Sequence, residues 1–453
     1  MNDRTTEVFE SMPVPQAVLR NALPAMAAML MVLVYNLADT FFIGQTGDAL
    51  QVAAVSLATP VFLIFMAVGT AFGVGGTSVI SRALGEGRRD YAKKVCSFCM
   101  WGSVFTGLVL AVLFLVFLDP ILAMIGASQD TWDYAGRYLW IVSFSAPFVL
   151  VSNCFSNVVR AEGESTRAML GQLIGNLLNV VLDPLFILAF GWGIGGAALA
   201  TLIGNAVGAL YYISFFVRGK SSLGVSIRNF TLKEGVCSGV LAIGIPSALG
   251  SLLMSVSQII LNALMAEYGD MAIAGMGVAM KVMTITGMVC MGLGQGVQPL
   301  LGYSAGSGNL ERLRKCLAFS LVFAFALGLA MTVLCYVFLD PIISAFLTDP
   351  EAYSYAVGFA RILLVTGFLF GIFYVLTNAV QALGNATAAL LVNLSRQGFV
   401  FIPALYALNA LMGVEGLAWA QPLADVLSVL FATVLFLWSY RKLGQRLSMK
   451  EVE

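Results

Sequence analysis

The chain of 453 residues is 59% hydrophobic and only 11% charged, with equal numbers of acidic and basic residues. Soluble domains carry about 25% charged residues, so a chain this long and this apolar is expected to lie in a membrane. It contains no histidine, which removes imidazole as a proton carrier or metal ligand, and its zero net charge gives no indication of nucleic-acid binding.

Twelve apolar stretches are long enough to cross a bilayer, whose hydrocarbon core of ~30 Å needs about 20 helical residues. Each stretch is bounded by charged residues or by a Gly or Pro. The predicted helices span residues 17–44, 52–82, 95–118, 134–158, 166–190, 194–217, 237–265, 272–303, 313–338, 354–381, 387–411 and 416–440. Six helices fall in each half of the chain, so both halves are expected to enter the membrane in the same direction.

Most of the 24 Lys and Arg residues lie on one side of these helices. They precede the first helix or lie in the even-numbered connections and the C-terminal tail, whereas the odd-numbered connections contain almost none. The positive-inside rule therefore predicts a multi-pass protein of the cytoplasmic (inner) membrane with both termini in the cytoplasm. Residues 1–16 contain acids and two prolines rather than an apolar leader, so we expect no removable signal peptide.

An internal repeat divides the chain into two similar halves. The hexapeptide Val116–Ile121 returns unchanged as Val337–Ile342, 221 residues later, and Pro24 and Pro246 are 222 residues apart. Parallel repeats of this kind predict an all-α membrane protein of twelve transmembrane helices in two six-helix lobes, related by a pseudo-twofold axis along the membrane normal. We expect an N-lobe at residues 1–217, a cytoplasmic linker at 218–235 and a C-lobe at 236–453.

Asp39 lies inside the first predicted helix, where an ionisable group is costly and usually functional. Tyr35 and Asn36 precede it by four and three residues and therefore share its helix face. The corresponding residue of the second half is Leu261, so the repeated fold does not require an acid at this position. We interpret Asp39 as part of a cation-coupling site, with Tyr35 and Asn36 beside it.

Asp183 is the second such acid of the first half and lies in the fifth predicted helix. Asn179 precedes it by four residues, and Pro184 follows it. A proline inside a helix bends it and frees the backbone carbonyl one turn earlier, and that oxygen can help to bind a cation or a water. The corresponding residue of the second half is the uncharged Ala404.

Asp39, Asp183 and Thr201 are expected at a similar depth in three helices, roughly 8–11 Å below the outer surface at about 1.5 Å per residue. Polar groups of three helices at one depth predict a site for a proton or a cation, including Na⁺ held by Asp39, Asp183 and Asn179. The alternative interpretation is that both acids are hydrogen-bonded groups that only pack helices. Two buried acids without a nearby basic partner cost more than such a role usually warrants.

Three charged residues of the second half fall near mid-depth, namely Lys281 in the eighth helix, Arg396 in the eleventh and Asp425 in the twelfth. Their charges can neutralise one another within the membrane. We interpret them either as a structural ion cluster or as part of a substrate cavity, and the balance of charge favours the cluster.

The sequence contains no convincing nucleotide, metal or redox motif. The glycine-rich runs Gly73–Gly76 and Gly292–Gly296 lie inside apolar helices and follow no strand, which argues against a dinucleotide loop and favours close helix packing. Cys96 and Cys99 have no second pair to complete a zinc site. We therefore expect no cofactor, no nucleotide and no nucleic-acid partner.

The motifs in combination are similar to those of the multidrug and toxic compound extrusion (MATE) family, and most closely to its MepA-type/DinF-like branch. The resemblance covers essentially the whole chain. Its motifs are Pro24 with Tyr35-Asn36-x-x-Asp39-Thr40, Ile80-Ser81-Arg82-x-Leu84-Gly85-x-Gly87, Arg160-Ala161-x-Gly163 and Asn179-x-x-x-Asp183-Pro184. An essential acid that other branches place in the seventh helix has no match here, which favours coupling in the N-lobe.

This resemblance implies a cation-coupled drug antiporter that works by alternating access between its two lobes. In such relatives the acids matching Asp39 and Asp183 bind the coupling H⁺ or Na⁺, with the residues matching Asn179 and Thr201 assisting. Bending of the first helix near Pro24 is linked to that event. The expected partners are small amphipathic, often cationic drugs and the lipid bilayer, and we expect a monomer.

Other functions fit the same sequence less well. A lipid-linked oligosaccharide flippase or an exporter of one metabolite would share the architecture, although a flippase should have a more cationic cavity for phosphates. A passive channel is disfavoured because duplicated lobes with buried carboxylates suit carriers better than pores. An enzyme would need a catalytic constellation, and the sequence has no histidine and no nucleophile motif.

Overall fold

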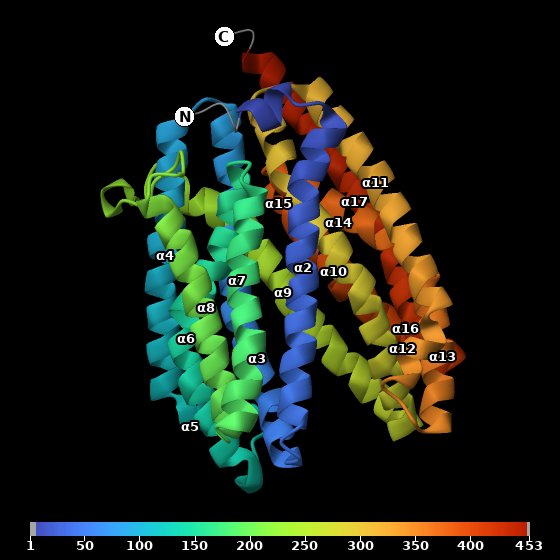
Figure 1. Ribbon diagram of the computed structural model, residues 1–453. Helices are drawn as coiled ribbons and strands as arrows, with labels where there is room; N and C mark the ends of the chain where they lie inside the picture. The colour runs from blue at the N-terminus through green and yellow to red at the C-terminus, as the bar shows by residue number, and fades with distance from the viewer. Residues whose placement is uncertain (1–5, 451–453) are drawn as a thin grey trace. The chain divides into compact units, whose positions relative to one another are not determined.

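The computed structural model describes residues 6–450, which form helices joined by short turns, with no strand in that range. Eleven helices are long and apolar enough to cross a membrane. A bent pair, α13 (Pro350–Leu364) and α14 (Leu369–Ala382), makes a twelfth span when it is counted as one. The structure therefore confirms the predicted all-α fold with its twelve membrane spans (Figure 1).

The spanning helices follow the order predicted from the apolar stretches. In the first half they are α2 (Val14–Gly44), α3 (Ala49–Gly85), α4 (Arg89–Val116), α6 (Gln129–Ala161), α7 (Ser165–Asp183) with its π-helical continuation η2 (Pro184–Ala189), and α8 (Gly193–Val217). In the second half they are α9 (Val236–Met265), α10 (Asp270–Gly306), α11 (Leu310–Val337), α13 and α14, α15 (Ala386–Leu394) with the π-turn η5 (Ser395–Phe399) and α16 (Phe401–Met412), and α17 (Val414–Lys450).

Local sequence signals explain where several helices begin and end. The side chain of Asp48 caps α3 by accepting a hydrogen bond of 3.0 Å from the backbone N–H of Leu50. Gly87 and Gly308 have φ angles of 74° and 72°, the left-handed backbone that favours glycine after a helix. These two glycines are 221 residues apart, so the sequence repeat extends to the backbone of the turns.

The repeated hexapeptide ends a spanning helix in each half and begins a short one. These short helices are α5 (Leu118–Met124) and α12 (Leu339–Ser344). Each carries its proline, Pro120 or Pro341, in the first turn, where a missing backbone N–H removes no helical hydrogen bond. The Asp-Pro pair therefore acts as a stop for the preceding membrane helix.

Contacts between residues divide the chain into two compact units. The first unit is Ala27–Ala248, and the second consists of Glu7–Met26 and the chain from Leu249 onwards. Helices α2 and α9 each contribute to both units, and each changes unit shortly after its internal proline, Pro24 or Pro246. The domain boundaries expected from the sequence repeat, at residues 217 and 236, follow a different criterion and stay a prediction.

Glycines allow the first part of α2 to pack closely within the second unit. A Cβ atom on Gly296 of α10 would lie 2.6 Å from the Cα of Ala22, and one on Gly292 would lie 2.7 Å from the Cα of Met26. No larger residue fits at these positions without displacing backbone. Close helix packing therefore accounts for the glycine-rich run of α10.

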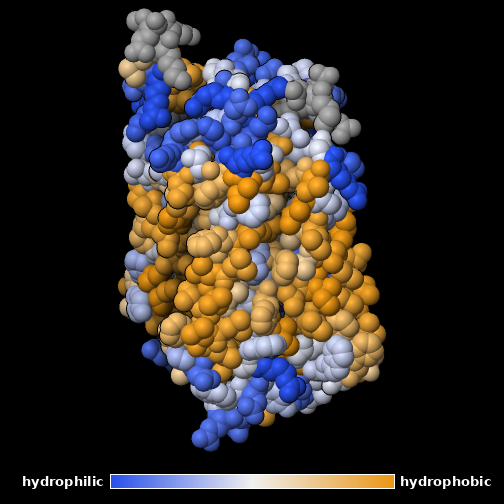
Figure 2. Space-filling view, turned by 90° about the vertical axis from the view of Figure 1, so that its left-hand side faces the viewer, coloured by the Kyte–Doolittle hydropathy of each residue, from blue (hydrophilic) through white to orange (hydrophobic). Residues whose placement is uncertain are grey.

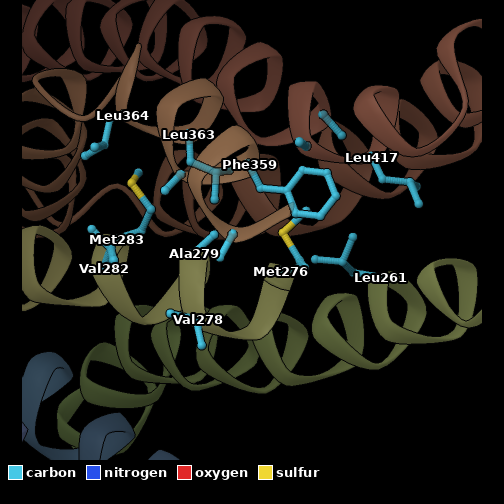
Figure 3. Close-up of a cluster of buried hydrophobic side chains, with 14 of the residues drawn as sticks. Leu261, Met276, Val278, Ala279, Val282, Met283, Phe359, Leu363, Leu364 and Leu417 are labelled. Carbon is cyan, nitrogen blue, oxygen red and sulfur yellow. The ribbon is translucent and has the colours of Figure 1, made fainter. Parts of the chain in front are cut away.

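Each unit has its own buried apolar cluster. In the first unit Phe65 of α3, Leu139 of α6 and Ile194 of α8 are almost completely buried together. In the second unit Met276 of α10 packs against Phe359 of α13 (Figure 3). Apolar side chains also cover the middle of the face shown in Figure 2, with hydrophilic residues at both ends, as expected for a surface in contact with lipid.

The linker between α8 and α9 is docked on α4 within the first unit. Trp101 donates from its indole Nε1 to the backbone carbonyl of Val225 at 3.0 Å, and the Ser97 hydroxyl donates to that of Gly224 at the same distance. Lys94 forms an ion pair of 2.7 Å with Glu234. The linker is therefore an ordered part of this unit.

Candidate cation-coupling site

The candidate site lies in the first unit, where three helices bring the predicted residues together. Helix α2 carries Tyr35 and Asp39, α7 carries Asn179 and Asp183, and α8 carries Thr201. The Asn179 side-chain amide donates a hydrogen bond of 3.2 Å to the Thr201 hydroxyl. Two of the three helices are therefore joined directly beside the acids.

Close approach of α7 and α8 depends on two glycines next to this site. A Cβ atom on Gly175 would lie 2.7 Å from the carbonyl oxygen of Gly204, and a Cβ atom on Gly204 would lie 2.7 Å from that of Gly175. Gly175 lies one turn before Asn179 on α7. The glycine contact therefore sets the helix spacing at which Asn179 reaches Thr201.

Both carboxylates contain oxygens that no donor satisfies. Asp183 is fully buried, and neither of its oxygens has a hydrogen-bond partner. Asp39 Oδ1 and the side-chain oxygen of Asn179 are likewise buried without a partner. Such groups are rare because leaving them unpaired costs free energy. Several unsatisfied acceptors in one place suit a proton or a hard cation, which prefers oxygen ligands.

The two acids also interact with each other, and nearby phenols complete the site. The charge of Asp39 acts on Asp183, and Tyr35 interacts with both acids and with the Thr201 side chain. Within residues 6–450 neither Asp39 nor Asp183 forms an ion pair with a Lys or Arg. The site therefore holds negative charge without a resident counter-charge.

The other predicted residues of this region lie in different surroundings. Asn36 is exposed on α2, and Pro24 lies in the part of α2 that belongs to the second unit. Pro184 directly follows Asp183 and begins the π-helical turn η2. Such π-turns are rare and are often found at functional sites, because they change the hydrogen-bonding pattern of the backbone.

Tyr138 is a member of the site that the sequence did not reveal. It lies on α6, is 7% exposed, and interacts electrostatically with Asp39, Tyr35 and Asp183. A tyrosine in an apolar helix is ordinary, so nothing in the sequence separates it from the core. A buried phenol usually needs a polar partner, and that rule is the signal that would have pointed to it.

In the second unit the structure brings together two of the three predicted charges. Arg396 Nε lies 2.8 Å from Asp425 Oδ1, and both residues are buried. Lys281 lies instead over the ring of Phe346, with its Nζ 5.0 Å from the ring centre. The expectation that all three charges neutralise one another is therefore met only by Arg396 and Asp425.

No group of three or more His, Cys, Asp or Glu side chains within residues 6–450 is arranged to hold a metal ion. Cys96 and Cys99 are buried free cysteines. The only oxygen-rich arrangement considered above is the one around Asp39 and Asp183, in which Asn179 and Thr201 supply the remaining polar groups.

The sequence profile of the MatE family matches residues 24–185 and 246–406, one segment in each half of the chain. The chain is 32% identical over 439 residues to the multidrug export protein MepA of Staphylococcus aureus strain MSSA476, covering 96% of each chain. It is also 32% identical over 457 residues to the MepA of Staphylococcus haemolyticus strain JCSC1435, covering each chain completely. These relatives are named as exporters and not as enzymes.

Solved structures share the fold. An outward-facing multidrug resistance MATE family transporter superimposes with a TM-score of 0.91 at 24% identity, covering 98% of each chain. A MOP superfamily transporter from Pyrococcus furiosus superimposes with a TM-score of 0.89 at 24% identity, covering 97% of this chain and 98% of the other. Together with the repeated profile match, these similarities show that the chain belongs to the MatE family of multi-pass membrane transporters.

Proposed function

We propose that this protein exports small amphipathic, often cationic drugs in exchange for H⁺ or Na⁺. The relatives named multidrug export proteins support the drug-export part of the proposal. The coupling part rests on one observation, the unsatisfied carboxylate oxygens of Asp39 and Asp183 in the first unit. No cofactor is needed, because the gradient of the coupling ion drives the transport.

The proposed mechanism follows from the cost of buried negative charge. An ion that enters from outside neutralises Asp39 and Asp183, with Asn179 and Thr201 holding their positions and offering further oxygens. Removal of that charge changes the relative stability of the outward and inward states, since only a differential interaction can shift such a balance. Bending of α2 near Pro24 transmits the change, and the drug leaves outward.

The proposed setting is the cytoplasmic membrane, with both termini in the cytoplasm and the protein acting as a monomer. The asymmetric distribution of Lys and Arg among the connections supports this orientation. Substrates are expected to enter from the inner side or from the bilayer. The alternative of a lipid-linked oligosaccharide flippase predicts no drug accumulation phenotype in cells that lack the protein.

Transport in proteoliposomes tests the coupling directly. Drug efflux is measured under a proton gradient and under a Na⁺ gradient, each imposed alone, for the wild type, Asp39→Asn and Asp183→Asn. Each substitution keeps the side-chain size but removes the charge, so we expect ion-driven efflux to fall to the level of empty liposomes. The exposed Asp119→Asn variant is the matched control and should transport normally.

Wild-type ion dependence in both site variants would reject the coupling site. Efflux that depends on neither gradient in the wild type would reject antiport itself.

A further inference from the structure

The tenth membrane span is bent, and no proline explains the bend. Helices α13 and α14 meet at an angle of 52° across a break at residues 365–368. Sharp kinks have identifiable causes, most often a proline. The break contains Val365, Thr366, Gly367 and Phe368, whereas the corresponding α6 of the first half contains Pro147 and is continuous.

A buried carboxylate is bonded to the break. The Thr366 hydroxyl donates to Asp425 Oδ2 at 2.9 Å, and Gln421 donates to Asp425 Oδ1 at 2.9 Å. Arg396 Nε donates to the same Oδ1 at 2.8 Å. Asp425 is 1% exposed and Thr366 is 5% exposed. The carboxylate on α17 is therefore fully used, and one of its bonds is to the break itself.

Arg396 holds the other side of the break. Its guanidinium lies over the ring of Phe370, 4.4 Å from the centre, and 5.4 Å from the ring centre of Phe373. Both rings belong to the first turns of α14. A cation over an aromatic face is attracted to it, more strongly where water is excluded. The Arg396–Asp425 pair thus contacts Thr366 before α14 and the aromatic rings within it.

The first unit packs its equivalent helices without any charge. The residues 221 positions before Arg396 and Asp425 are Gly175 and Gly204, the two glycines that bring α7 and α8 together. A glycine contact is therefore sufficient for this kind of helix packing. A buried ion pair is weak support for stability by itself, so the charges of the second unit require another explanation.

We propose that the Arg396–Asp425 pair is a brace that holds the bend of the tenth span through Thr366, and that this bend is a hinge of the second unit. Release of the Thr366 hydroxyl from Asp425 lets the span straighten, while the ion pair itself stays closed. The brace acts separately from the capture of the coupling ion at Asp39 and Asp183. Arg396, Asp425 and Thr366 are positioning residues in this scheme and need not touch the drug.

A distance across the bend tests the brace without any transport assay. Spin labels are placed at the exposed positions Ser354 and Thr387, in a Cys237→Ser background because the other six cysteines are buried. Thr366→Val removes only the hydroxyl bond, and straightening should lengthen the label distance by roughly 4 Å, given a rise of about 1.5 Å per residue. Thr366→Ser keeps the hydroxyl and should keep the wild-type distance.

Thr332→Val is the matched control, because the Thr332 hydroxyl lies close to Gly367 of the break but makes no hydrogen bond. Its distance should equal that of the wild type. An unchanged distance in Thr366→Val, or an equal change in Thr332→Val, would overturn the brace. If Thr366→Val does not fold, Thr366→Ala carries the same expectation and the same contrary outcome.

The hinge role has its own readout, which rests on the proposed function. Thr366→Val should slow drug turnover in proteoliposomes while the dependence on the ion gradient persists, since the two acids of the first unit are intact. Normal turnover in a variant with a straightened span would overturn the hinge. Because the distance is measured without drug or gradient, failure of the proposed antiport would not affect that part of the test.

Discussion

Asp183 combines complete burial with two unsatisfied oxygens, which makes it an expensive residue for the fold. We expect Asp183→Asn to stabilise the protein, by about 1–3 kcal/mol, because it replaces an uncompensated buried charge by a neutral amide of the same shape. The measurement is the midpoint of thermal unfolding in detergent at pH 8, where the wild-type acid tends towards its charged form.

The sign of this effect separates the two interpretations of the acid. A gain in stability with a loss of ion-driven efflux is the pattern of a residue kept for function at the expense of the fold. A loss of stability would mean that Asp183 holds the helices together, which is the packing interpretation. Asp425→Asn provides the contrast, because it leaves Arg396 buried without its charged partner and should destabilise the protein.

The linker between the halves is anchored by a buried acid outside the membrane spans. Glu162 follows α6, is 3% exposed, and accepts hydrogen bonds from the Ser221 hydroxyl and from the backbone N–H of Leu223. Burial raises the pKa of Glu162 from 4.5 to about 7, although the bonds from Ser221 and Leu223 oppose the shift. Nearby Glu164 adds a repulsion that raises the pKa further.

The raised pKa predicts how the docking of this element depends on pH. The folded state binds the proton more tightly than the unfolded state, so the contribution of Glu162 is complete below pH 4.5 and is lost as the pH rises through about 7. We expect the wild type to lose up to about 2–3 kcal/mol relative to Glu162→Gln between pH 5 and pH 8. Thermal unfolding of both proteins across this range measures the difference, and parallel curves would contradict it.

At the scale of the helices, the sequence predicts what the bilayer imposes. Span number, order and approximate ends follow from apolar length, and the acids at positions 39 and 183 stand out because charge is costly in lipid. The contact of Asn179 with Thr201 also follows, since the expected depths of the two residues are similar.

The remaining features depend on contacts that a single sequence does not encode as a pattern. The bend at Thr366 arises from a bond to a residue 59 positions away, without a proline to mark it. Tyr138 enters the site from α6 as an ordinary aromatic residue. Lys281 shares its predicted depth with Arg396 and Asp425 but lies over Phe346, because depth does not fix the direction in which a side chain points.

For the whole molecule, the parallel repeat makes equivalent positions of the two halves face the same side of the membrane. Asp130 and Glu351 are 221 residues apart, both are exposed, and both lie in the first turn of a helix in the predicted outer half of the chain's connections. Lys93 and Arg314 are likewise 221 residues apart, at the start of α4 and α11. A cysteine introduced at each position, in the Cys237→Ser background, reports its side by reaction with a membrane-impermeant maleimide.

We expect Asp130→Cys and Glu351→Cys to react in intact cells, and Lys93→Cys and Arg314→Cys to react only after the membrane is opened. This outcome requires an even number of spans in each half, which makes the bent pair α13 and α14 a single crossing. If Glu351 reacted from outside while Arg314 did so too, the tenth span would not be one crossing, and the two halves would run in opposite directions. An inverted repeat would then relate the halves by an axis in the membrane plane, and Asp39 and the second-unit brace would no longer work at matching ends of a transport cycle.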